Sequence, residues 1–432
     1  MTQTISIGLL GLGTVGSGVV HIIEQHQDKL KHQVGCNVEV KHILVNNLEK
    51  KRDVVLNGAK LTANPDDVLN DPDLDVIIEV MGGVDGTKDY IVQALQNKKH
   101  VVTANKDLMA VHGSELLEVA SENRCDLFYE ASVAGGIPIL RSLVEGLSSD
   151  RITKMMGILN GTTNYILTKM TQEGAAYDDV LKEAQELGYA EADPTADVEG
   201  IDAARKIAIL GTLGFSMHLD LDDVSIAGIS QVSKEDLDYS KQLGYTMKLI
   251  GIADRTGDKV EVSVQPALFP ETHPLAAVND EFNAVYVYGE AVGETMFYGP
   301  GAGKLPTATA VVSDLVEVMK NIRLGVTGNS AVLPQFEKSL KNDDEIEAKY
   351  FLRLHAKDQP GTFSALTALF SSYGVSLEKI LQQPAKEEGV ADIVMTTHTV
   401  SKKNYQAILQ QLHDLDVVSE IKSSYRVEGD ES

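Results

Sequence analysis

Residues 5–20 read ISIGLLGLGTVGSGVV, a short apolar stretch that runs into five glycines and then resumes with a helical apolar pattern. The beginning is typical of a buried strand. Gly11, Gly13 and Gly16 form G-x-G-x-x-G at the start of the expected helix. In this setting the first glycine permits a tight turn, the second lets a pyrophosphate approach the backbone, and the third lets the helix pack against the strand. The stretch predicts a Rossmann-type dinucleotide-binding domain rather than a packing turn without a ligand.

Composition limits the remaining possibilities. The chain has 432 residues and is 43% hydrophobic, enough for several domains with sizeable cores. Its 38 Lys and Arg against 63 Asp and Glu give a formal charge of −25, which argues against nucleic acid or an anionic membrane as a main partner. Two cysteines cannot build a disulfide framework, which fits a reducing compartment. With no signal-like start and no long apolar run, we expect a cytoplasmic protein.

The end of the second expected strand, residues 38–45, bears on the choice of dinucleotide. Strands at this position usually end in Asp or Glu when the fold prefers NAD, because the carboxylate binds the ribose 2′-hydroxyl. Here Asn46 and Asn47 follow, and then the basic run 50–52. This pattern favours NADP, or use of both cofactors, although the basic run is equally compatible with a solvated loop.

Further expected strands at 75–80, 100–106 and 127–130 continue the α/β alternation. In open α/β sheets ligands bind at the carboxyl ends of the strands, so Lys106 is well placed for function. Glu130 is followed by a glycine loop whose carbonyls could hold a hard cation, although a plain tight turn is the simpler interpretation.

The second region contains the polar groups best suited to a substrate. Thr163 belongs to a set of hydroxyls and amides at an expected helix start, where they could bind a carboxylate or simply cap the helix. Asp202 and Lys206 are spaced i,i+4 and share one helix face, so they could pair. A lysine held between burial and a carboxylate can exchange protons with a substrate oxygen, whereas a surface ion pair is the plainer alternative. Glu191 and Asp197, with Asp202, could receive an ammonium group.

The C-terminal part alternates differently. A polar linker is expected at 326–347, and beyond it strands and helices follow in the order βαββαβ, which is ferredoxin-like. The turn at 358–361 reads DQPG, and with this turn the segment resembles an ACT domain, a small amino-acid-sensing module. A dimerisation module without a ligand is the alternative, because fold alone does not determine function.

Five long motifs in order resemble the bacterial homoserine dehydrogenase family with a C-terminal ACT domain. They are GLGTVG at 11–16, VVTANK at 101–106, GILNGTTNYIL at 157–167, EADPTADVEGIDAARK at 191–206 and YGPGAGKLPTA at 298–308. The resemblance implies reversible, NAD(P)-dependent reduction of L-aspartate 4-semialdehyde to L-homoserine in threonine, methionine and isoleucine biosynthesis. A dinucleotide- and amino-acid-binding sensor without turnover is the alternative from another functional class.

The resemblance also assigns roles to residues. Lys206 matches the proton-transfer lysine and Lys106 the lysine beside the nicotinamide. The implied substrate residues are Glu191, Asp202, Asp197 and Thr163, and the implied cofactor residues are Gly11, Gly13, Thr14, Val15, Gly16, Lys106 and Gly303. A monovalent cation, sodium, is implied at the Glu130 side chain and at the carbonyls of Val133, Gly135 and Ile137.

The implied organisation has four parts. A dinucleotide-binding domain at 1–137 is completed by about 305–325, a mixed α+β substrate and dimerisation domain follows at 138–304, a linker at 326–347 and an ACT regulatory domain at 348–428. We expect a homodimer or homotetramer, with threonine as an effector at the ACT domain.

Overall fold

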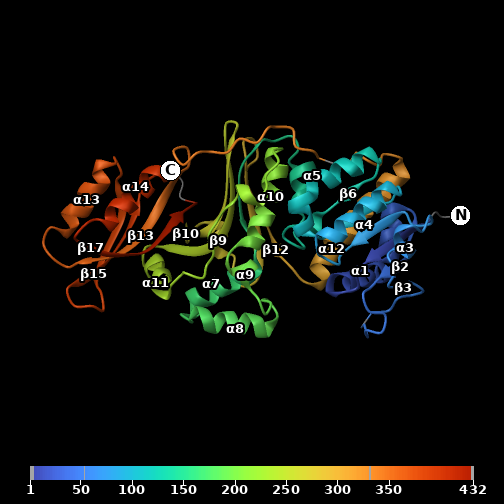
Figure 1. The fold of residues 1–432 in the computed structure, drawn as a ribbon, viewed down its shortest axis with the longest axis horizontal. Coiled ribbons are helices and arrows are strands. Elements are labelled where there is room, and N and C mark those ends of the chain that lie inside the picture. Colours follow the sequence, from blue (N-terminus) through green and yellow to red (C-terminus); the bar gives the residue numbers. More distant parts are fainter. Residues whose placement is uncertain (1–3, 53, 330–331, 430–432) are drawn as a thin grey trace. The chain divides into compact units, whose positions relative to one another are not determined.

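The computed structural model describes residues 4–52, 54–329 and 332–429 (Figure 1). The chain forms two compact units, and each is built from separate stretches of sequence. Unit 1 contains the chain up to Met155 together with Ala204–Asp223 and Asn283–Lys338, and unit 2 contains Met156–Ala203, Val224–Phe282 and the chain from Ser339 onward.

Unit 1 is built on a six-stranded sheet in the order β3-β2-β1-β4-β5-β6, in which neighbouring strands pair in parallel. The strands are β1 (Thr4–Leu10), β2 (Asn37–Leu44), β3 (Lys60–Thr62), β4 (Val76–Glu79), β5 (His100–Thr103) and β6 (Leu127–Phe128). This order, with its reversal between β1 and β4, is that of a dinucleotide-binding α/β fold. The Rossmann-type prediction is confirmed.

The helices of unit 1 pack on this sheet. They are α1 (Thr14–Gln25), α2 (Gln27–Val34), α3 (Asp66–Leu69), α4 (Asp85–Gln96), α5 (Lys106–Glu122) and, after a long return of the chain, α12 (Lys304–Leu324). Buried residues of α1 and α12, such as Val19 and Leu315, share one core with Ile7 of β1. A search of the described residues finds no helix with the length and hydropathy needed to cross a membrane.

Short elements link the sheet of unit 1 to the rest of the chain. They are the 3-10 helix Glu130–Ser132, α6 (Ile139–Arg141), a π-helical turn at Ser142–Gly146 and β7 (Ile152–Ile158), which crosses the boundary between the units. The strands β11 (Phe282–Gly289) and β12 (Gly293–Pro300) are hydrogen-bonded neighbours.

Unit 2 begins with helices and continues with a long antiparallel hairpin. The helices are α7 (Gly161–Glu173), α8 (Tyr177–Leu187), α9 (Thr195–Val198), the start of α10 (Ile201–Phe215) and α11 (Lys234–Gln242). The hairpin pairs β9 (Tyr245–Thr256) with β10 (Lys259–Pro270), and the short β8 (Ser225–Ile226) pairs with β10. The sequence indicates a strand only at 260–264, in the first half of β10, and β9 was not predicted.

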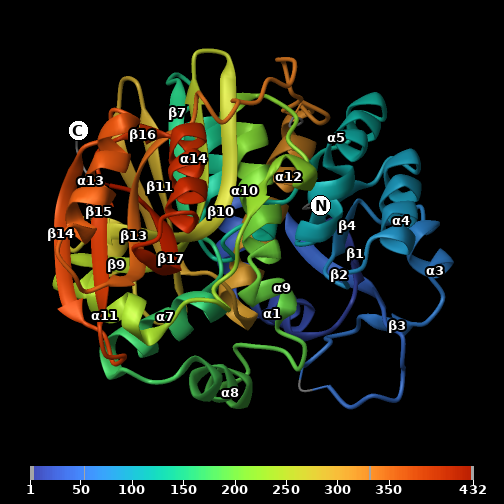
Figure 2. The ribbon, with the colours of Figure 1, turned by 60° about the vertical axis from the view of Figure 1, so that its left-hand side comes forward.

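The C-terminal part of unit 2 has the predicted βαββαβ order. Its elements are β13 (Glu347–Lys357), α13 (Thr362–Ser372), β14 (Leu377–Pro384), β15 (Val390–Thr397), the short β16 (Val400–Ser401), α14 (Lys402–His413) and β17 (Val418–Val427). The sheet order is β17-β13-β15-β14, and α13 and α14 contribute to one core against it (Figure 2). The ferredoxin-like, ACT-type fold is confirmed. Its β17 also pairs in parallel with β10, a contact that the sequence does not indicate.

Candidate active site

The glycine turn after β1 has the predicted geometry. Gly11 has a left-handed φ of 102°, and a Cβ there would lie 2.9 Å from the carbonyl oxygen of Val80. A Cβ at Gly16 would lie 2.2 Å from the carbonyl oxygen of Gly11, so only glycine lets α1 approach the turn. At Gly13 a Cβ would meet no protein atom within 4 Å. The backbone at Gly13 is therefore open at a helix N-terminus, as binding of an anionic pyrophosphate requires.

The returning helix α12 brings Gly303 to the same region of unit 1. Gly303 precedes α12 with a φ of 122°. A Cβ at Gly18 of α1 would lie 2.5 Å from the carbonyl oxygen of Lys304, so the N-terminus of α12 packs directly on α1. Thr14 and Val15 form the first turn of α1. Apart from Lys106 on α5, the cofactor residues implied by the resemblance thus lie in the turn before α1, at the start of α1, or directly before α12, and these two helices are in contact.

Lys106 is the first residue of α5, just after the carboxyl end of β5. The Asn105 side chain caps α5 by accepting the Leu108 backbone N–H at 3.1 Å, and its amide donates to the Gly83 carbonyl at 2.6 Å. Asn105 therefore fixes the start of α5 to the loop that follows β4. Lys106 stands at the edge of the sheet where ligands of this fold bind.

Glu79 is a buried carboxylate at the end of β4. It accepts hydrogen bonds from the Met81 and Gly82 backbone N–H groups and from the Thr103 hydroxyl. Burial raises the pKa of this carboxyl, and the hydrogen bonds oppose that rise. Glu79 thus joins the ends of β4 and β5, where the sequence analysis assigned it no role.

An ion pair brings α5 and α10 together within unit 1. The Arg205 guanidinium lies 3.0 Å from Asp107 Oδ1. Each partner is the chain neighbour of a predicted catalytic lysine, since Asp107 follows Lys106 and Arg205 precedes Lys206. The pair therefore holds the helix segments that carry Lys106 and Lys206 beside each other. Lys206 is half-buried, as is Lys106.

Two of the predicted acidic residues of unit 2, Asp197 and Asp202, are linked by one amide. Asn160 Nδ2 donates to Asp197 Oδ1 at 2.7 Å and to Asp202 Oδ2 at 2.9 Å. Thr163 lies beside them, because its backbone N–H and hydroxyl both contact Asn160 Oδ1, at 2.9 and 3.0 Å. Asp202 is 3% exposed and stands one helical turn before Lys206 on α10. The structure brings Thr163, Asp197 and Asp202 into one cluster.

Glu191 differs from the three residues of this cluster in being exposed. Its side chain is exposed, and its backbone carbonyl accepts the Gln185 side-chain amide at 3.0 Å. The preceding turn is attached to α7, because the Thr162 hydroxyl donates to the Tyr189 carbonyl at 2.7 Å. Glu191 is therefore positioned by its backbone, with its carboxylate exposed.

The Glu130 region is a buried polar centre in unit 1. Both Glu130 carboxylate oxygens accept backbone N–H groups, from Leu140 and Arg141, at 2.8 Å each. The Glu130 backbone N–H donates to Asp314 Oδ2 at 2.9 Å, and Arg141 Nη2 lies 2.6 Å from Asp314 Oδ1. Burial raises the pKa of Glu130, and burial together with the Glu130 charge raises that of Asp314 to about 8.

The loop after Glu130 carries the three carbonyls that the resemblance assigns to a cation. Val133, Gly135 and Ile137 are all buried, and Gly135 has a φ of 51°. A Cβ at Gly135 would lie 2.3 Å from the Gly301 carbonyl oxygen, so the loop packs tightly on the segment before α12. Over residues 4–52, 54–329 and 332–429, no group of three or more His, Cys, Asp or Glu side chains could hold a metal. A cation here would depend mainly on backbone carbonyls.

Hydrogen bonds within the loop after β2 connect its residues to one another. Asn47 Oδ1 accepts the Glu49 and Lys50 backbone N–H groups at 2.9 and 3.2 Å, and Arg52 Nη2 donates to the Asn47 carbonyl at 2.7 Å. Lys50 is exposed, whereas Arg52 is partly buried across the loop. The basic groups therefore lie beside the end of β2.

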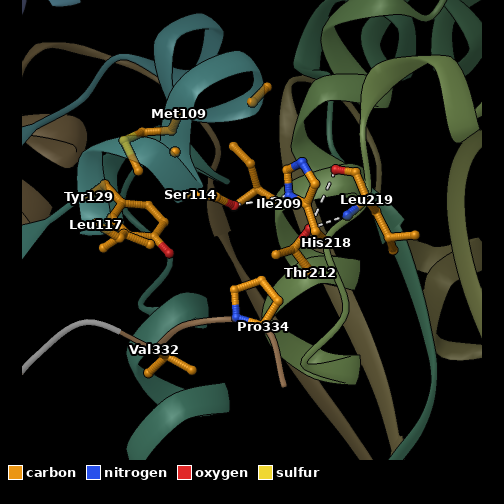
Figure 3. Close-up of a pocket in the computed structure, with 12 residues that line it drawn as sticks. Met109, Ser114, Leu117, Tyr129, Ile209, Thr212, His218, Leu219, Val332 and Pro334 are labelled. Atoms are coloured by element: carbon orange, nitrogen blue, oxygen red, sulfur yellow. Dashed lines mark hydrogen bonds between the residues drawn. The ribbon is translucent and has the colours of Figure 1, made fainter. Parts of the chain in front are cut away.

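A pocket of about 420 Å³, including open solvent, lies between α5 and α10, farther along both helices than the lysines (Figure 3). Met109 and Leu117 form part of its apolar wall. Ser114 Oγ lies 3.0 Å from His218 Nδ1, and His218 Nε2 lies 2.8 Å from Asp220 Oδ1. This hydrogen-bonded chain fixes the loop after α10 to α5. None of the predicted site residues lines the pocket.

The two cysteines have the character of core residues. Cys36 and Cys125 are both buried and unpaired by disulfides. Burial raises the pKa of the Cys125 thiol to about 11, so it stays protonated at neutral pH. This disfavours thiol-dependent chemistry of the aspartate-semialdehyde dehydrogenase kind.

Sequence reasoning missed several of the polar groups that organise these sites. The sequence places Asn160 only in a polar helix start. It predicts no role for Asp314 or Arg141, because their partners are distant in the chain. One signal was available for Asp314, which is one of two acidic residues within the apolar run at 311–319 of α12. Such a residue inside a buried helix face indicates a specific partner.

Comparison with known proteins agrees with this geometry. The family model described as "Homoserine dehydrogenase, NAD binding domain" matches residues 11–130, "Homoserine dehydrogenase" matches 138–316, and "ACT domain" matches 350–417. The chain is 67% identical over 428 residues to the homoserine dehydrogenase of Bacillus subtilis, covering 99% of each chain.

Solved structures extend the likeness to three dimensions. A homoserine dehydrogenase from Thiobacillus denitrificans superimposes with a TM-score of 0.93 at 40% identity, covering 99% of both chains. The S. aureus homoserine dehydrogenase at pH 7.5 gives 0.79 at 41% identity and covers both chains completely. A hyperthermophilic archaeal homoserine dehydrogenase in complex with NADPH gives 0.61 at 26% identity, over 73% of this chain and 98% of that one.

The glycine turn, the lysine at the end of β5, the acidic cluster before Lys206 and full-length similarity to curated relatives all agree, and the chain belongs to the homoserine dehydrogenase family.

Proposed function

We propose that this protein interconverts L-homoserine and L-aspartate 4-semialdehyde with NADP or NAD, with Lys206 transferring the proton. The observation that carries the proposal is the placing of α10. This helix carries Asp202 one turn before Lys206, and Arg205 pairs with Asp107 at the start of α5, directly after Lys106. A carboxylate for substrate binding and two lysines for the reacting oxygen are thus carried by two helices.

The two lysines have different roles in the proposed reaction. When bound, the nicotinamide supplies the hydride acceptor or donor. Lys206 removes the hydroxyl proton of homoserine as the carbonyl forms, and returns it in the reverse direction. The Lys106 ammonium stabilises negative charge that develops on the same oxygen. Both lysines act on one atom, so each must lie within hydrogen-bond reach of it in the substrate complex.

The acidic residues orient the substrate. Asp202, Asp197 and the exposed Glu191 bind the ammonium group of the amino acid, and Thr163 at the start of α7 binds its carboxylate. The buried position of Asp202 strengthens this electrostatic binding, because solvent screens it less. Binding the amino acid through both charged ends leaves its side-chain oxygen for the lysines.

The dinucleotide lies along the glycine turn, on Gly11, Gly13, Thr14, Val15, Gly16 and Gly303. We propose a preference for NADP or use of both cofactors, since Asn46 and Asn47 put no carboxylate at the end of β2 and Lys50 is exposed nearby. Comparison of kcat/KM for NADP⁺ and NAD⁺ tests this point, and a strong preference for NAD⁺ would contradict it.

A sodium ion fits the charge of the Glu130 region. Two buried carboxyl groups, Glu130 and Asp314, lie close together there, and the Arg141 guanidinium pairs with Asp314. A monovalent cation held by Glu130 and by the carbonyls of Val133, Gly135 and Ile137 would favour the ionised forms of these two carboxyl groups, whose pKa values burial raises. It would hold the loop and need take no part in the chemistry. Thermal stability should then rise with NaCl more than with an equal concentration of choline chloride.

The remaining organisation follows the family. We propose a dinucleotide domain at 1–137 completed by 305–325, a substrate and dimerisation domain at 138–304, a linker at 326–347 and an ACT regulatory domain at 348–428. The full chain is proposed to form a homodimer or homotetramer that threonine inhibits through the ACT domain. The reaction would serve threonine, methionine and isoleucine biosynthesis. Sedimentation and inhibition curves with L-threonine test the assembly and the effector.

A direct assay tests the function. Purified protein is mixed with L-homoserine and NADP⁺ or NAD⁺, and the absorbance of the reduced cofactor is followed. Homoserine-dependent reduction supports the enzyme. Binding of cofactor and amino acid without reduction would instead support the sensor, which the full-length similarity to enzymes does not favour.

A further inference from the structure

Asn160 lies in unit 2, where α7, α9 and the first turn of α10 meet. It directly precedes α7, and its side chain is 5% exposed. Its amide donates at 2.7 Å to Asp197 of α9 and at 2.9 Å to Asp202 in the first turn of α10. One buried side chain therefore connects the starts of α7 and α10 with α9.

The orientation of this amide is determined by its partners. The Thr163 backbone N–H approaches Asn160 at 2.9 Å, and since an N–H can only donate, the atom that it meets must be the carbonyl oxygen Oδ1. The –NH₂ group then faces the two carboxylates, which accept hydrogen bonds when ionised. Both amide protons are used, one for each carboxylate.

This arrangement has an electrostatic consequence. Two oxygens bonded to one –NH₂ group lie only about 5 Å apart, so two negative charges are held close together. Like charges at this distance oppose each other's ionisation, whereas hydrogen bonds donated to the ionised form favour it. The amide holds the carboxylates together and favours their ionised forms, because it only donates hydrogen bonds and adds no charge of its own. The pair is thereby suited to a small cationic group.

We propose that Asn160 is a positioning residue for the substrate ammonium group, acting through Asp197 and Asp202. It fixes their separation and their ionised state. Because Asp202 stands one turn before Lys206, the same amide also sets the first turn of the helix that carries the proton-transfer lysine. This inference rests on the proposed function, in which both carboxylates bind that ammonium.

Asn160→Ser separates this role from helix capping. Serine caps a helix about as well as asparagine, so the bond to the Thr163 N–H is retained while both bonds to the carboxylates are lost. We expect KM for L-homoserine to rise about tenfold or more, with kcat changed less and KM for NADP⁺ within about twofold of wild type. The acid limb of kcat/KM for homoserine should move to higher pH, because the ionised carboxylates lose their donor.

Asn160→Asp provides a second, nearly isosteric variant. It keeps the capping oxygen but places a third carboxylate against the other two. We expect a larger rise in KM for homoserine and a larger displacement of the acid limb than in Asn160→Ser. A role in packing alone does not predict this order, because aspartate fits the site better than serine.

Asn164, one turn along α7, is the matched control. Its buried amide donates to the carbonyls of Val278, Asp280 and Phe282 at 3.2, 2.9 and 3.1 Å, with no carboxylate among them. Asn164→Ser should lower the melting temperature but leave the acid limb of kcat/KM where it is in the wild type.

The results distinguish a failure of the proposed function from a failure of the role proposed for Asn160. Wild-type protein that does not oxidise homoserine would refute the proposed function itself. Active wild type, with Asp202→Asn raising KM for homoserine and Asn160→Ser leaving KM and the acid limb unchanged, would overturn only the role of Asn160. Failure of both Asn160 variants to fold would assign the residue to stability and overturn the inference as well.

Discussion

Lys206 is the residue on which the proposed chemistry depends. It is half-buried on α10, one turn after the buried Asp202 and next to Arg205, which pairs with Asp107. Lys206→Ala should lower kcat about 100-fold or more, because a general acid–base group is lost, while the Kd for NADP⁺ changes by less than about threefold. Lys169→Ala, which removes a lysine paired with Glu173 on α7, is the control and should leave kcat unchanged. Parallel losses of kcat and cofactor affinity in Lys206→Ala would indicate a structural lysine.

The burial of Lys248 leads to a prediction about stability that does not involve catalysis. On β9 it is 1% exposed, and its ammonium donates to Asn164 Oδ1 at 3.2 Å and to the Val278 carbonyl. Burial lowers its pKa to about 8 from the ordinary value of 10.5. Between these two pH values the unfolded chain binds more protons at this site than the folded chain, so the contribution of Lys248 to stability rises with pH.

The measurement is urea unfolding of wild type and Lys248→Met at several pH values. The difference in free energy of unfolding, wild type minus variant, should rise between pH 8 and pH 10.5 by up to about 3 kcal/mol. A difference that is the same at both ends of this window would show that the folded Lys248 keeps its ordinary proton affinity.

At the level of single elements, the glycine turn offers two substitutions of the same size with opposite effects. Gly16→Ala places a Cβ 2.2 Å from the Gly11 carbonyl oxygen, so we expect a loss of stability of about 2 kcal/mol or more. Gly13→Ala meets no protein atom within 4 Å, so the fold should be preserved, but the new methyl group obstructs the pyrophosphate. KM for NADP⁺ should rise about tenfold in Gly13→Ala, with the melting temperature nearly unchanged. Equal effects of the two changes on KM and on melting would contradict this view of the turn.

The elements that the sequence predicts well are those with strong local patterns. β1, α1 and the strands of the parallel sheet other than β3 follow from apolar periodicity and glycine spacing. Their observed ends differ from the predicted ones by a few residues. The strand predicted at 100–106, for example, is β5, which ends at Thr103, and Lys106 is the first residue of α5. β9 was missed although it is long and mostly buried. Its pattern TMKLIGIA is nearly continuous and apolar, and Lys248 interrupts it where only a tertiary partner explains a charge.

Across the whole molecule, the pairing of β17 with β10 makes the C-terminal sheet continuous with the β9–β10 hairpin. Arg426 of β17 is 5% exposed and pairs with Glu261 of β10 and with Glu428. Arg426→Met leaves two buried carboxylates without this partner and should cost about 3–5 kcal/mol in chemical unfolding of the full chain. Arg151→Met breaks an exposed pair with Glu290 and should cost less than about 1 kcal/mol. Similar losses from both variants would mean that the buried pair does not hold β17 to β10.

The long-range pairings mark the limit of what the sequence predicts. The motifs suffice to predict the family and the fold class, and they nominate the candidate site residues. They do not predict that β17 lies beside β10, that Arg141 meets Asp314, or that one amide bonds Asp197 and Asp202. Each of these contacts joins segments far apart in the chain through partners that have no local pattern. These contacts can be identified only in the folded structure, where tertiary packing determines which buried polar groups lie side by side.

The most direct test of the central claim is to measure kcat for cofactor reduction by wild type and by Lys206→Ala. Both L-homoserine and NADP⁺ are supplied at saturating concentrations. Wild type should reduce the cofactor only when homoserine is present, and the variant should bind both ligands yet reduce it about 100-fold more slowly or worse. Undiminished turnover in a variant that lacks the Lys206 amine would contradict the assignment of proton transfer to this residue.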